Sequence, residues 1–384
     1  MNIGFEAKRF FTNYTGLGNY SRFVIDALSQ TYPQNNLYLY SPRVVDHVEN
    51  QAILTRKNIQ VIAPSGIFAM PVVSALWRTW AVSKNSSVKH LNLFHGLSQE
   101  LPVGLPRHIK KVVTVHDLIF LRYPQFYNAV DVAIYKRKVQ LACEMADKII
   151  AISQQTADDI KQFLKVDKTA KIEVVYQGCH PIFKKEISKT KFDEVRKKYS
   201  LPGEFVLSVG TVEERKNLML VIKAIALLPK AERLPLVVVG RHTGYYHEVV
   251  KEIERAGLSD IVRFLTNVAF HDLPALYRLA KLFVYPSRFE GFGIPLVEAI
   301  TCGIPPITST GSCFQEAAGA GGVYVNPDDA DALAREVKEL VNNDLRRKEL
   351  IAAGQKHIQQ FEPTFIAQRL NDVYRAVVPE ESIV

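Results

Sequence analysis

Short runs of β-forming residues alternate with amphipathic helical stretches along almost the whole chain, and this alternation constrains the fold more than any other feature. It favours parallel sheets covered by helices, because parallel strands are joined through long crossover connections. Two doubly wound sheets accommodate the expected strands better than one open sheet of that size. The expected strands are Asn2–Phe5, Leu37–Tyr40, Leu91–Phe94, Lys111–Val115, Lys148–Ile152, Lys171–Val175, Phe205–Val209, Leu236–Val239, Val262–Leu265, Leu282–Tyr285, Pro306–Thr308 and Gly322–Val325. The predicted class is therefore α/β, with two Rossmann-like domains.

The 384 residues exceed what one ordinary hydrophobic core covers, so two domains are expected. The boundary is predicted in the polar, aperiodic segment Pro181–Thr190, after which the helical pattern Lys191–Tyr199 starts a new unit. We therefore predict an N-terminal domain over residues 1–185 and a C-terminal domain over residues 186–384.

The composition excludes several classes of protein. The first residues, MNIGFEAKRFF, lack a basic region followed by a long apolar run, so no signal peptide is expected. No apolar stretch approaches the roughly 20 residues that cross a bilayer. The four cysteines are scattered without a CxxC pair, which fits a reducing compartment and argues against structural zinc. Together these features predict a soluble, cytoplasmic protein.

Positive charge is concentrated in the N-terminal half. Residues 1–185 contain 23 Lys and Arg against 13 Asp and Glu, although the whole chain has a net charge of only +9. A basic surface suits nucleic acid, an anionic membrane or a phosphorylated substrate, and scattered solvated lysines explain it equally well. The segment Gly66–Val82 adds both tryptophans, Trp77 and Trp80. Such a segment is typical of a membrane interface or of a buried helix, and the sequence favours neither.

The segment Tyr285–Ile307, YPSRFEGFGIPLVEAITCGIPPI, combines an expected strand end, a turn with two glycines and a helix start. A glycine turn that leads into a helix N-terminus lets backbone N–H groups approach a phosphate, and the helix dipole adds attraction. Glu290 precedes the turn and Glu298 lies about one turn into the helix, with seven residues between them. Glu290 is thereby expected at the carboxyl edge of the sheet, where open α/β folds bind ligands. Glycine and proline before a helix are also common where no ligand binds.

This segment resembles the E-x7-E signature of the retaining GT-B glycosyltransferases of family 4, group 1, and is similar to that of bacterial polysaccharide mannosyltransferases. VGTVEERKNL at Val209–Leu218 is similar to the family's basic loop, and TGLGNY at Thr15–Tyr20 is similar to its N-terminal glycine loop. VHDL at Val115–Leu118 and ADKIIAIS at Ala146–Ser153 fit the same order. The resemblance covers nearly the whole chain.

The resemblance implies two domains that face each other across a cleft, with the acceptor bound by the N-terminal domain and the nucleotide-sugar donor by the C-terminal one. It also implies that the last helix, about residues 363–377, crosses back to the N-terminal domain. The residues it assigns to catalysis are His116, Arg215, Lys216 and Glu290. The residues it assigns to donor binding are Gly16, Gly18, Arg215, Lys216, Gly291, Phe292, Gly293, Ile294 and Glu298.

Two adjacent cations in the basic loop also make chemical sense. Fixed cations stabilise the charge that develops on a nucleoside diphosphate leaving group. Many relatives have an arginine directly after the first glycine of this loop, where the chain has Thr211, so Arg215 is expected to substitute for it. By contrast, a lone histidine at a strand end, such as His116, is most often structural. Gly16-x-Gly18 without a third glycine is a weak fingerprint by itself.

Asp329 and Asp331 resemble a metal-binding DxD motif. Their segment, NPDDADALA, is more typical of a helix N-cap followed by an acidic first turn. We therefore predict no metal site and no cofactor, with the nucleotide diphosphate sugar acting as donor substrate.

The resulting hypothesis is a metal-independent, retaining glycosyltransferase that moves a hexose onto a saccharide acceptor in cell-surface polysaccharide assembly. Similarity to mannosyltransferases favours GDP-mannose as donor, with UDP-sugars next. No residue stands out as a covalent nucleophile, which favours a same-face displacement in which the leaving phosphate accepts the acceptor's proton. The acceptor is expected to be linked to polyprenyl diphosphate, with peripheral contact at the inner face of an anionic membrane and no nucleic-acid partner. Two alternatives stay open, a nucleotide-sugar epimerase of the same fold and a non-catalytic donor-binding subunit.

Overall fold

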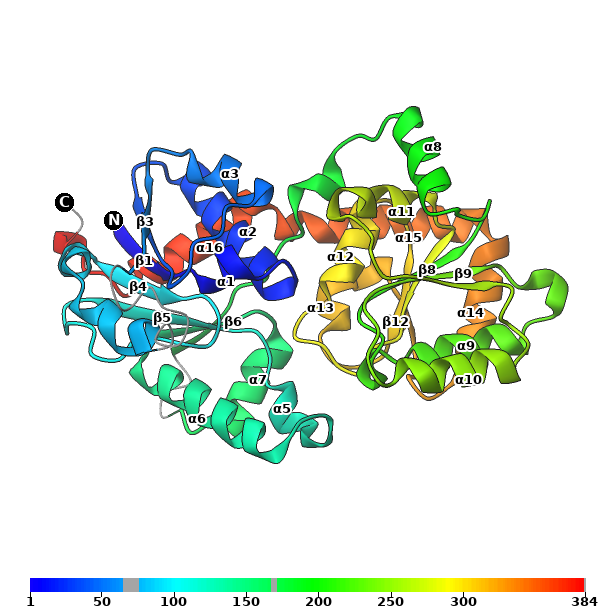
Figure 1. Cartoon of the computed structure of the whole chain (residues 1–384), viewed down its shortest axis with the longest axis horizontal. Coiled ribbons are helices and arrows are strands. Elements are labelled where there is room, and N and C mark those ends of the chain that lie inside the picture. The colour runs from blue at the N-terminus through cyan, green and yellow to red at the C-terminus, as the bar shows by residue number, and fades with distance from the viewer. Residues whose placement is uncertain (65–75, 167–170, 383–384) are drawn as a thin grey trace. The chain divides into compact units, whose positions relative to one another are not determined.

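The computed structural model describes residues 1–64, 76–166 and 171–382. Contacts divide the chain into unit 1, which contains Met1–Gly178 and Phe361–Val384, and unit 2, which contains Cys179–Gln360 (Figure 1). The division therefore falls slightly before the boundary at 185/186 that the sequence suggested. The reason is Phe183, whose buried ring packs against Tyr277 of unit 2 and whose carbonyl oxygen accepts a hydrogen bond from Arg278 at 2.8 Å.

Seven parallel strands within the described ranges form the sheet of unit 1, in the order β3-β2-β1-β4-β5-β6-β7. Six of them match expected strands, whereas β3 was not expected because it is a short edge strand with two exposed positions, Gln60 and Val61. The strands are β1 (Asn2–Glu6), β2 (Asn36–Tyr40), β3 (Ile59–Ile62), β4 (Leu93–Gly96), β5 (Lys110–Val115), β6 (Lys148–Ala151) and β7 (Ile172–Val174).

Six parallel strands form the sheet of unit 2, in the order β10-β9-β8-β11-β12-β13, and all six were expected from the sequence. This is the Rossmann order, in which the direction of strand addition reverses between two neighbouring strands, here β8 and β11. The corresponding point in unit 1 lies between β1 and β4. The strands are β8 (Val206–Val209), β9 (Leu236–Val239), β10 (Val262–Leu265), β11 (Leu282–Tyr285), β12 (Pro306–Ser309) and β13 (Val323–Val325).

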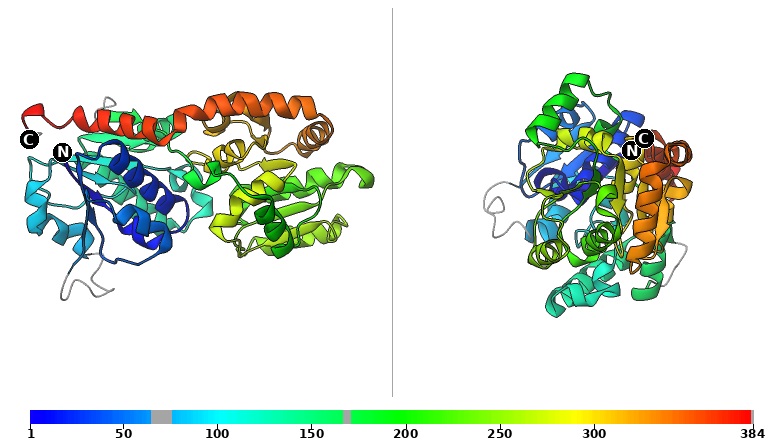
Figure 2. Two further views of the ribbon diagram at one scale, coloured as in Figure 1. Left: turned by 90° about the horizontal axis from the view of Figure 1, so that it is seen from above. Right: turned by 90° about the vertical axis from the view of Figure 1, so that its right-hand side faces the viewer.

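Helices cover both sheets and supply their cores. In unit 2, Val221 of α9, Val249 of α10 and Leu333 of α14 are buried in one apolar cluster with the strands. In unit 1, α16 packs along α2, so the C-terminal segment is part of that unit (Figure 2). The helices of unit 1 are α1 (Lys8–Thr12), α2 (Gly16–Thr31), α3 (Val48–Leu54), α5 (Ile119–Arg122), α6 (Ala129–Met145), α7 (Gln154–Phe163) and α16 (Pro363–Arg375). Those of unit 2 are α8 (Lys189–Lys198), α9 (Leu218–Leu227), α10 (Tyr246–Arg255), α11 (Leu273–Leu279), α12 (Ile294–Thr301), α13 (Phe314–Ala318), α14 (Ala330–Asn342) and α15 (Asp344–His357).

None of the helices in the described ranges combines the length and the apolar composition needed to span a membrane.

Candidate active site

The carboxyl edge of the unit 2 sheet carries two loops at the point where the strand order reverses. The loop after β8 contains Arg215 and Lys216 in one turn of 3-10 helix, and the loop after β11 leads to Glu290. Strands β8 and β11 are neighbours in the sheet, so their loops lie side by side although Lys216 and Glu290 are 74 residues apart. Open α/β sheets bind ligands at this edge.

Main-chain and side-chain bonds fix the two loops to each other. Asn217 adopts the left-handed conformation, with φ of 57°, and its amide group donates to the carbonyl oxygens of Pro286 at 3.2 Å and Pro327 at 2.8 Å. The N–H group of Arg288 donates to the carbonyl oxygen of Arg215 at 2.8 Å. The geometry of the two loops is therefore built by the protein before any ligand binds.

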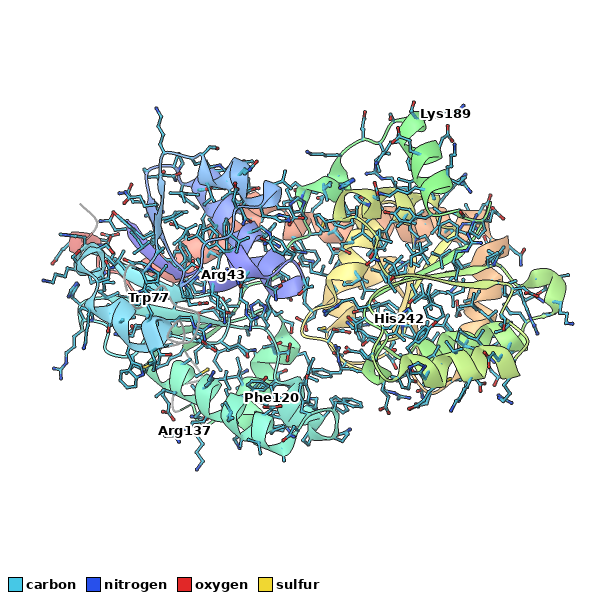
Figure 3. The ribbon with its side chains drawn as sticks, viewed as in Figure 1. Arg43, Trp77, Phe120, Arg137, Lys189 and His242 are labelled. Atoms are coloured by element: carbon cyan, nitrogen blue, oxygen red, sulfur yellow. The ribbon has the colours of Figure 1, made fainter. Side chains whose placement is uncertain are left out.

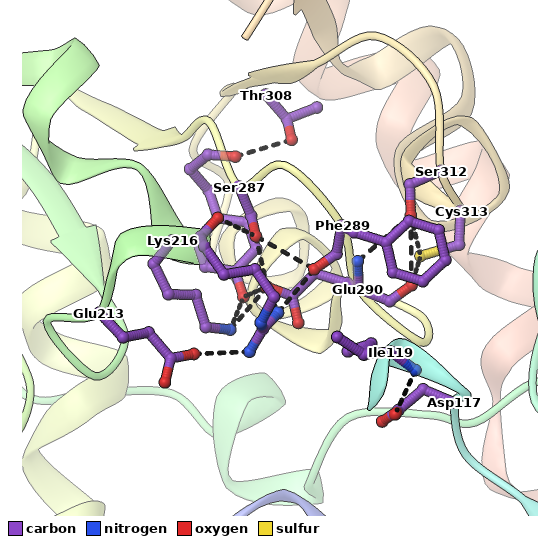
Figure 4. Close-up of polar contacts among 12 residues, drawn as sticks. Asp117, Ile119, Glu213, Lys216, Ser287, Phe289, Glu290, Thr308, Ser312 and Cys313 are labelled. Atoms are coloured by element: carbon purple, nitrogen blue, oxygen red, sulfur yellow. Dashed lines mark hydrogen bonds and ion pairs between the residues drawn. The ribbon is translucent and has the colours of Figure 1, made fainter. Parts of the chain in front are cut away.

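Glu290 is the centre of this arrangement (Figure 4). Burial alone would raise the pKa of its carboxyl group, but the charges of Lys216 and Arg215 outweigh burial and hold the pKa at about 2. Its second oxygen, Oε2, has no partner among the residues that the structure describes, so this side of an ionised carboxylate is left for a ligand. The donors to Oε1 are Lys216 Nζ at 2.6 Å, Arg215 Nη1 at 2.8 Å, Ser287 Oγ at 2.7 Å and Tyr285 OH at 2.9 Å.

The two cations are themselves partly neutralised inside the protein. Arg215 also donates through Nη2 to Glu213 at 2.6 Å and through Nη1 to the carbonyl oxygen of Phe289 at 2.6 Å. Burial would lower the pKa of Arg215, yet Glu290 and Glu213 raise it above its usual value. Cations at the start of a helix are unfavourable without an anion nearby. Here the protein itself supplies part of that negative charge, so the presence of the cations does not by itself indicate a bound phosphate.

The glycine turn follows Glu290 directly. Gly293 has φ of 93°, a conformation that favours glycine, and α12 begins at Ile294. The first N–H groups of α12 have no acceptor within the helix and are aimed out of its N-terminus. Phe292 and Gly291 are both buried within this turn.

Glu298 lies on α12 in an environment unlike that of Glu290. Its Oε2 accepts a hydrogen bond from Tyr277 OH at 3.0 Å, and burial raises the pKa of its carboxyl group to about 7. At neutral pH this group therefore exists in both protonation states and can donate or accept hydrogen bonds.

Unit 1 contains a cavity of about 250 Å³ at the carboxyl ends of its strands. Three aromatic rings and several charged groups line it, a combination that suits a polar ligand with apolar faces. The lining residues are Arg9, Leu17, Ser98, Gln99, Glu100, His116, Asp117, Phe120, Tyr127, Tyr135, Lys138 and Val139.

His116 follows β5 and lines this cavity as a neutral ring. Its Nε2 donates to the carbonyl oxygen of Leu97 at 2.8 Å, and its ring meets the ring of Tyr20 edge to face, with centroids 4.6 Å apart. Burial lowers the pKa of His116 to about 4. Because Nε2 carries the proton, Nδ1 is left as a hydrogen-bond acceptor.

The two glycines of the N-terminal loop have different environments. A Cβ atom on Gly18 would lie 1.6 Å from the carbonyl oxygen of Asn13, so packing of α2 against its own loop already requires glycine there. Gly16 begins α2, is exposed and has open space at its Cβ position. Of the two, only Gly16 has free space for a ligand.

Asp329 is a helix N-cap, as the sequence suggested. Its Oδ1 accepts the N–H of Ala332 at 2.8 Å, and Asp331 lies in the first turn of α14. No cluster of three or more His, Cys, Asp or Glu residues suited to a metal ion occurs within residues 1–64, 76–166 and 171–382.

Residues 66–75 of the aromatic segment Gly66–Val82 lie outside the described residues. In the remainder, the two tryptophans differ. Trp77 is 4% exposed and belongs to the core of unit 1, whereas Trp80 is 56% exposed.

Sequence reasoning missed Tyr285, Ser287 and Glu213 as members of the site. Tyr285 and Ser287 stand in the quoted segment before Glu290, and Glu213 stands in the basic loop, so their positions carried a signal. What the sequence did not show was that their side chains converge on Glu290 and Arg215.

Comparisons with known proteins define the class. The profile described as "Glycosyltransferase Family 4" matches residues 23–181, and that described as "Glycosyl transferases group 1" matches residues 191–357. The crystal structure of Anabaena HepE in complex with UDP-glucose aligns with a TM-score of 0.71 and 20% identity, over 98% of this chain and 100% of its own. The chain is therefore a glycosyltransferase, and its fold is that of the GT-B enzymes.

Two similar proteins from Escherichia coli are both named mannosyltransferases. "O-antigen chain mannosyltransferase B" is 26% identical over 375 residues, which are 94% of this chain and 96% of the relative. "Serotype-specific mannosyltransferase WbdA" is 30% identical over 279 residues, which are 68% of this chain but only 33% of WbdA. The chain thus spans about a third of WbdA. It belongs to the group 1, family 4 glycosyltransferases, as the motifs implied.

Proposed function

We propose that this glycosyltransferase transfers mannose from GDP-mannose to a saccharide acceptor, with retention of the anomeric configuration and without a metal ion. The observation that carries the proposal is the cluster of Glu290, Arg215 and Lys216 at the sheet edge. It keeps a carboxylate ionised, with one oxygen open to sugar hydroxyls, beside two cations that suit a diphosphate. Mannose is supported by the names of the two relatives, both mannosyltransferases.

Donor binding is assigned to unit 2. Lys216 uses two of its three ammonium hydrogens on Tyr285 OH and Glu290, at 2.5 and 2.6 Å, which leaves one for a phosphate oxygen. Arg215 and the N–H groups of Gly293 and Ile294 at the start of α12 add further positive potential. Glu298 would hydrogen-bond the ribose hydroxyls, in either protonation state.

The transfer step breaks the bond between the anomeric carbon and the phosphate oxygen, whose electron pair stays on the departing nucleoside diphosphate. The acceptor oxygen bonds to the anomeric carbon from the same face, and its proton passes to the departing phosphate oxygen. Arg215 and Lys216 stabilise the charge that develops there. Glu290 is a poor nucleophile because its Oε1 accepts bonds from four donors and its pKa is about 2, which favours a mechanism without a covalent intermediate.

Acceptor binding is assigned to the cavity of unit 1. Phe120, Tyr127 and Tyr135 offer aromatic faces on which sugar rings pack, and Arg9 offers hydrogen-bond donors. His116 would accept a hydrogen bond from a sugar hydroxyl at Nδ1, which has no partner among the described residues. The family resemblance implies instead that His116 contacts the donor sugar near the scissile bond.

The acceptor is proposed to be linked to a polyprenyl diphosphate and reached at an anionic membrane surface. Helix α6 supports this, because its first half is almost entirely exposed and Arg137 lies on its outer surface (Figure 3). Exposed apolar residues are followed there by the basic run 136–138, a combination found in segments that rest on a membrane interface, and the acidic Asp131 is exposed among them. Among the exposed residues of α6 that do not line the cavity are the apolar Val130, Ile134 and Leu141 and the basic Lys136 and Arg137.

Two measurements with the purified protein test the proposal. A thermal-shift series with GDP, UDP and ADP is expected to favour GDP, since a ligand at 100 times its Kd stabilises the native state by about 2.7 kcal/mol. GDP-mannose and a mannose-terminated oligosaccharide are then expected to give GDP and a product extended by one α-linked mannose. An epimerised nucleotide sugar without acceptor, or GDP binding without any product, would contradict the proposal.

A further inference from the structure

A chain of buried polar side chains runs through unit 1 from the C-terminal helix to His116. Tyr374 OH on α16 lies 2.7 Å from His95 Nδ1, and His95 Nε2 lies 2.8 Å from Thr114 Oγ1. Thr114 Oγ1 lies 3.1 Å from Tyr20 OH, and the ring of Tyr20 meets the ring of His116. All five residues are buried, so this chain does not exchange its partners with bulk water.

The number of donor protons on these hydrogen-bonded side chains indicates that the ring of His95 is neutral. Three hydroxyl groups and a neutral imidazole bring four protons to three hydrogen bonds, so one proton is already in excess. A second ring proton on His95 would add another donor inside an apolar core, where an unpaired donor is costly. With both nitrogens of His95 engaged, its ring cannot turn without breaking two hydrogen bonds.

The ring of His116 contacts the carbonyl oxygen of Leu97 and the ring of Tyr20, while its backbone carbonyl oxygen accepts a separate hydrogen bond from Thr156 Oγ1 at 3.2 Å. The carbonyl oxygen of Leu97, which binds Nε2 of His116, follows shortly after His95 at the end of β4. Tyr20, which packs on the ring, is bonded to Thr114, two residues before His116 on β5. A shift of His95 or Thr114 therefore changes the direction of Nδ1 in the cavity.

We infer that Tyr374, His95 and Thr114 are positioning residues, which act through Tyr20 to orient His116. The inference makes the C-terminal helix part of the geometry of the cavity, although Tyr374 itself does not line it. Its effect on catalysis rests on the proposed role of His116, whereas the orientation of the ring can be measured without any substrate.

The test compares Thr114→Val and Tyr374→Phe, which remove hydroxyl groups and keep the shape, with the control Tyr40→Phe. Tyr40 is also buried in unit 1, and its OH lies 2.7 Å from Ser87 Oγ. Neither residue belongs to the hydrogen-bonded series from Tyr374 to Tyr20. The ring signal of His116 in NMR spectra of histidine-labelled protein, assigned through its loss in His116→Gln, is expected to move in the two test variants only. Turnover is expected to fall roughly tenfold with the donor KM unchanged, because misplacement by about 1 Å costs up to 10²-fold.

An unmoved His116 signal in both test variants would overturn the inference, as would an equal shift in Tyr40→Phe. If the signal moves while turnover stays at the wild-type value, the positioning of His116 is supported but its proposed role in transfer fails. Wild-type activity of His116→Ala would show that second point separately. Tyr20→Phe keeps the ring on His116 but removes its hydroxyl, and it repeats the test if Thr114→Val does not fold.

Discussion

Glu290 of unit 2 and the histidines of unit 1 are buried in opposite charge states, although the order of the strands reverses in the same manner in both units. In unit 2, Glu290 is buried as an ion, with the charges of Arg215 and Lys216 within 2.8 Å. In unit 1, His95 and His116 are buried as neutral rings, and burial lowers their pKa values to about 3 and 4. The buried carboxylate assigned to the donor thus lies in unit 2 and the two buried neutral rings lie in unit 1, although unit 1 also buries charged side chains such as Arg22 and Asp159.

This difference matches what each proposed ligand would do during transfer. A diphosphate gains negative charge as it leaves, and fixed charges that need no rearrangement stabilise that change most. Sugar hydroxyls stay neutral, and neutral acceptors bind them without the desolvation penalty of a buried ion.

The largest effect is expected from removing the cations of unit 2. Lys216→Ala and Arg215→Ala should each lower turnover by roughly 10²-fold or more, because transition-state stabilisation is lost. Each variant also leaves the buried carboxylate of Glu290 with one charged partner fewer, so its melting temperature should fall. Steady-state kinetics with the donor and thermal unfolding measure the two effects separately.

Arg288→Ala is the matched control, because Arg288 lies on the same pair of loops but pairs with Asp328 at 2.7 Å, away from Glu290. It should keep turnover within about threefold of wild type, as surface pairs contribute little. Turnover close to wild type in both cation variants would remove the diphosphate assignment and with it the contrast between the units.

Acid should weaken unit 1 before unit 2. Both histidines have pKa values lowered from 6.5, so the unfolded chain binds more protons below that pH and native stability falls as pH decreases. Between pH 7 and 5 each histidine should cost about 2 kcal/mol. The contribution of Glu290 is lost only as pH falls from 4.5 towards 2. The raised pKa of Glu298 acts in the other direction, since its stability contribution is lost as pH rises from 4.5 to 7.

Urea unfolding at pH 7 and pH 5 checks this sign. The loss of stability between the two pH values should be smaller in His95→Gln than in wild type, and unchanged in His90→Gln, which replaces an exposed histidine. A wild-type protein that is equally stable at both pH values, with no difference between the variants, would show that unit 1 does not bury neutral histidines.

The sequence was sufficient for the fold because its signals are local. Strong apolar runs marked all strands except β3, which is short and half exposed at a sheet edge. Glu290, Arg215 and Lys216 could each be placed at a strand end, but their mutual bonds depend on β8 and β11 being neighbours. Contacts between distant segments left no signal, as with His95 and Tyr374, which are 279 residues apart. Gly18 is the opposite case. The motif assigned it to donor binding, but the packing of α2 against its own loop is enough to require glycine there.

A smaller effect is expected at the surface of unit 1. The protein should cosediment with anionic but not neutral liposomes at low salt, and Trp80→Ala should weaken this binding by a factor of about three to ten, because an exposed ring can enter the interface. Salt should weaken binding steeply. Trp77→Ala serves as the control, since Trp77 is buried and its loss should lower stability rather than liposome affinity. Wild-type protein that ignores anionic liposomes at low salt would contradict the membrane proposal.

The smallest expected effect is that of a chelator. Transfer should stay within about twofold of its normal rate in excess EDTA, because Arg215 and Lys216 supply next to the diphosphate the charge that a divalent ion supplies in other enzymes. Asp329, the best metal ligand suggested by the DxD pattern, has its Oδ1 engaged as the N-cap of α14 at 2.8 Å. Complete loss of activity, restored by Mg²⁺ or Mn²⁺, would return Asp329 and Asp331 to consideration. It would also mean that the fixed charges of unit 2 are not sufficient to stabilise the leaving group. The contrast between the units would then describe the protein without substrate and not the reaction.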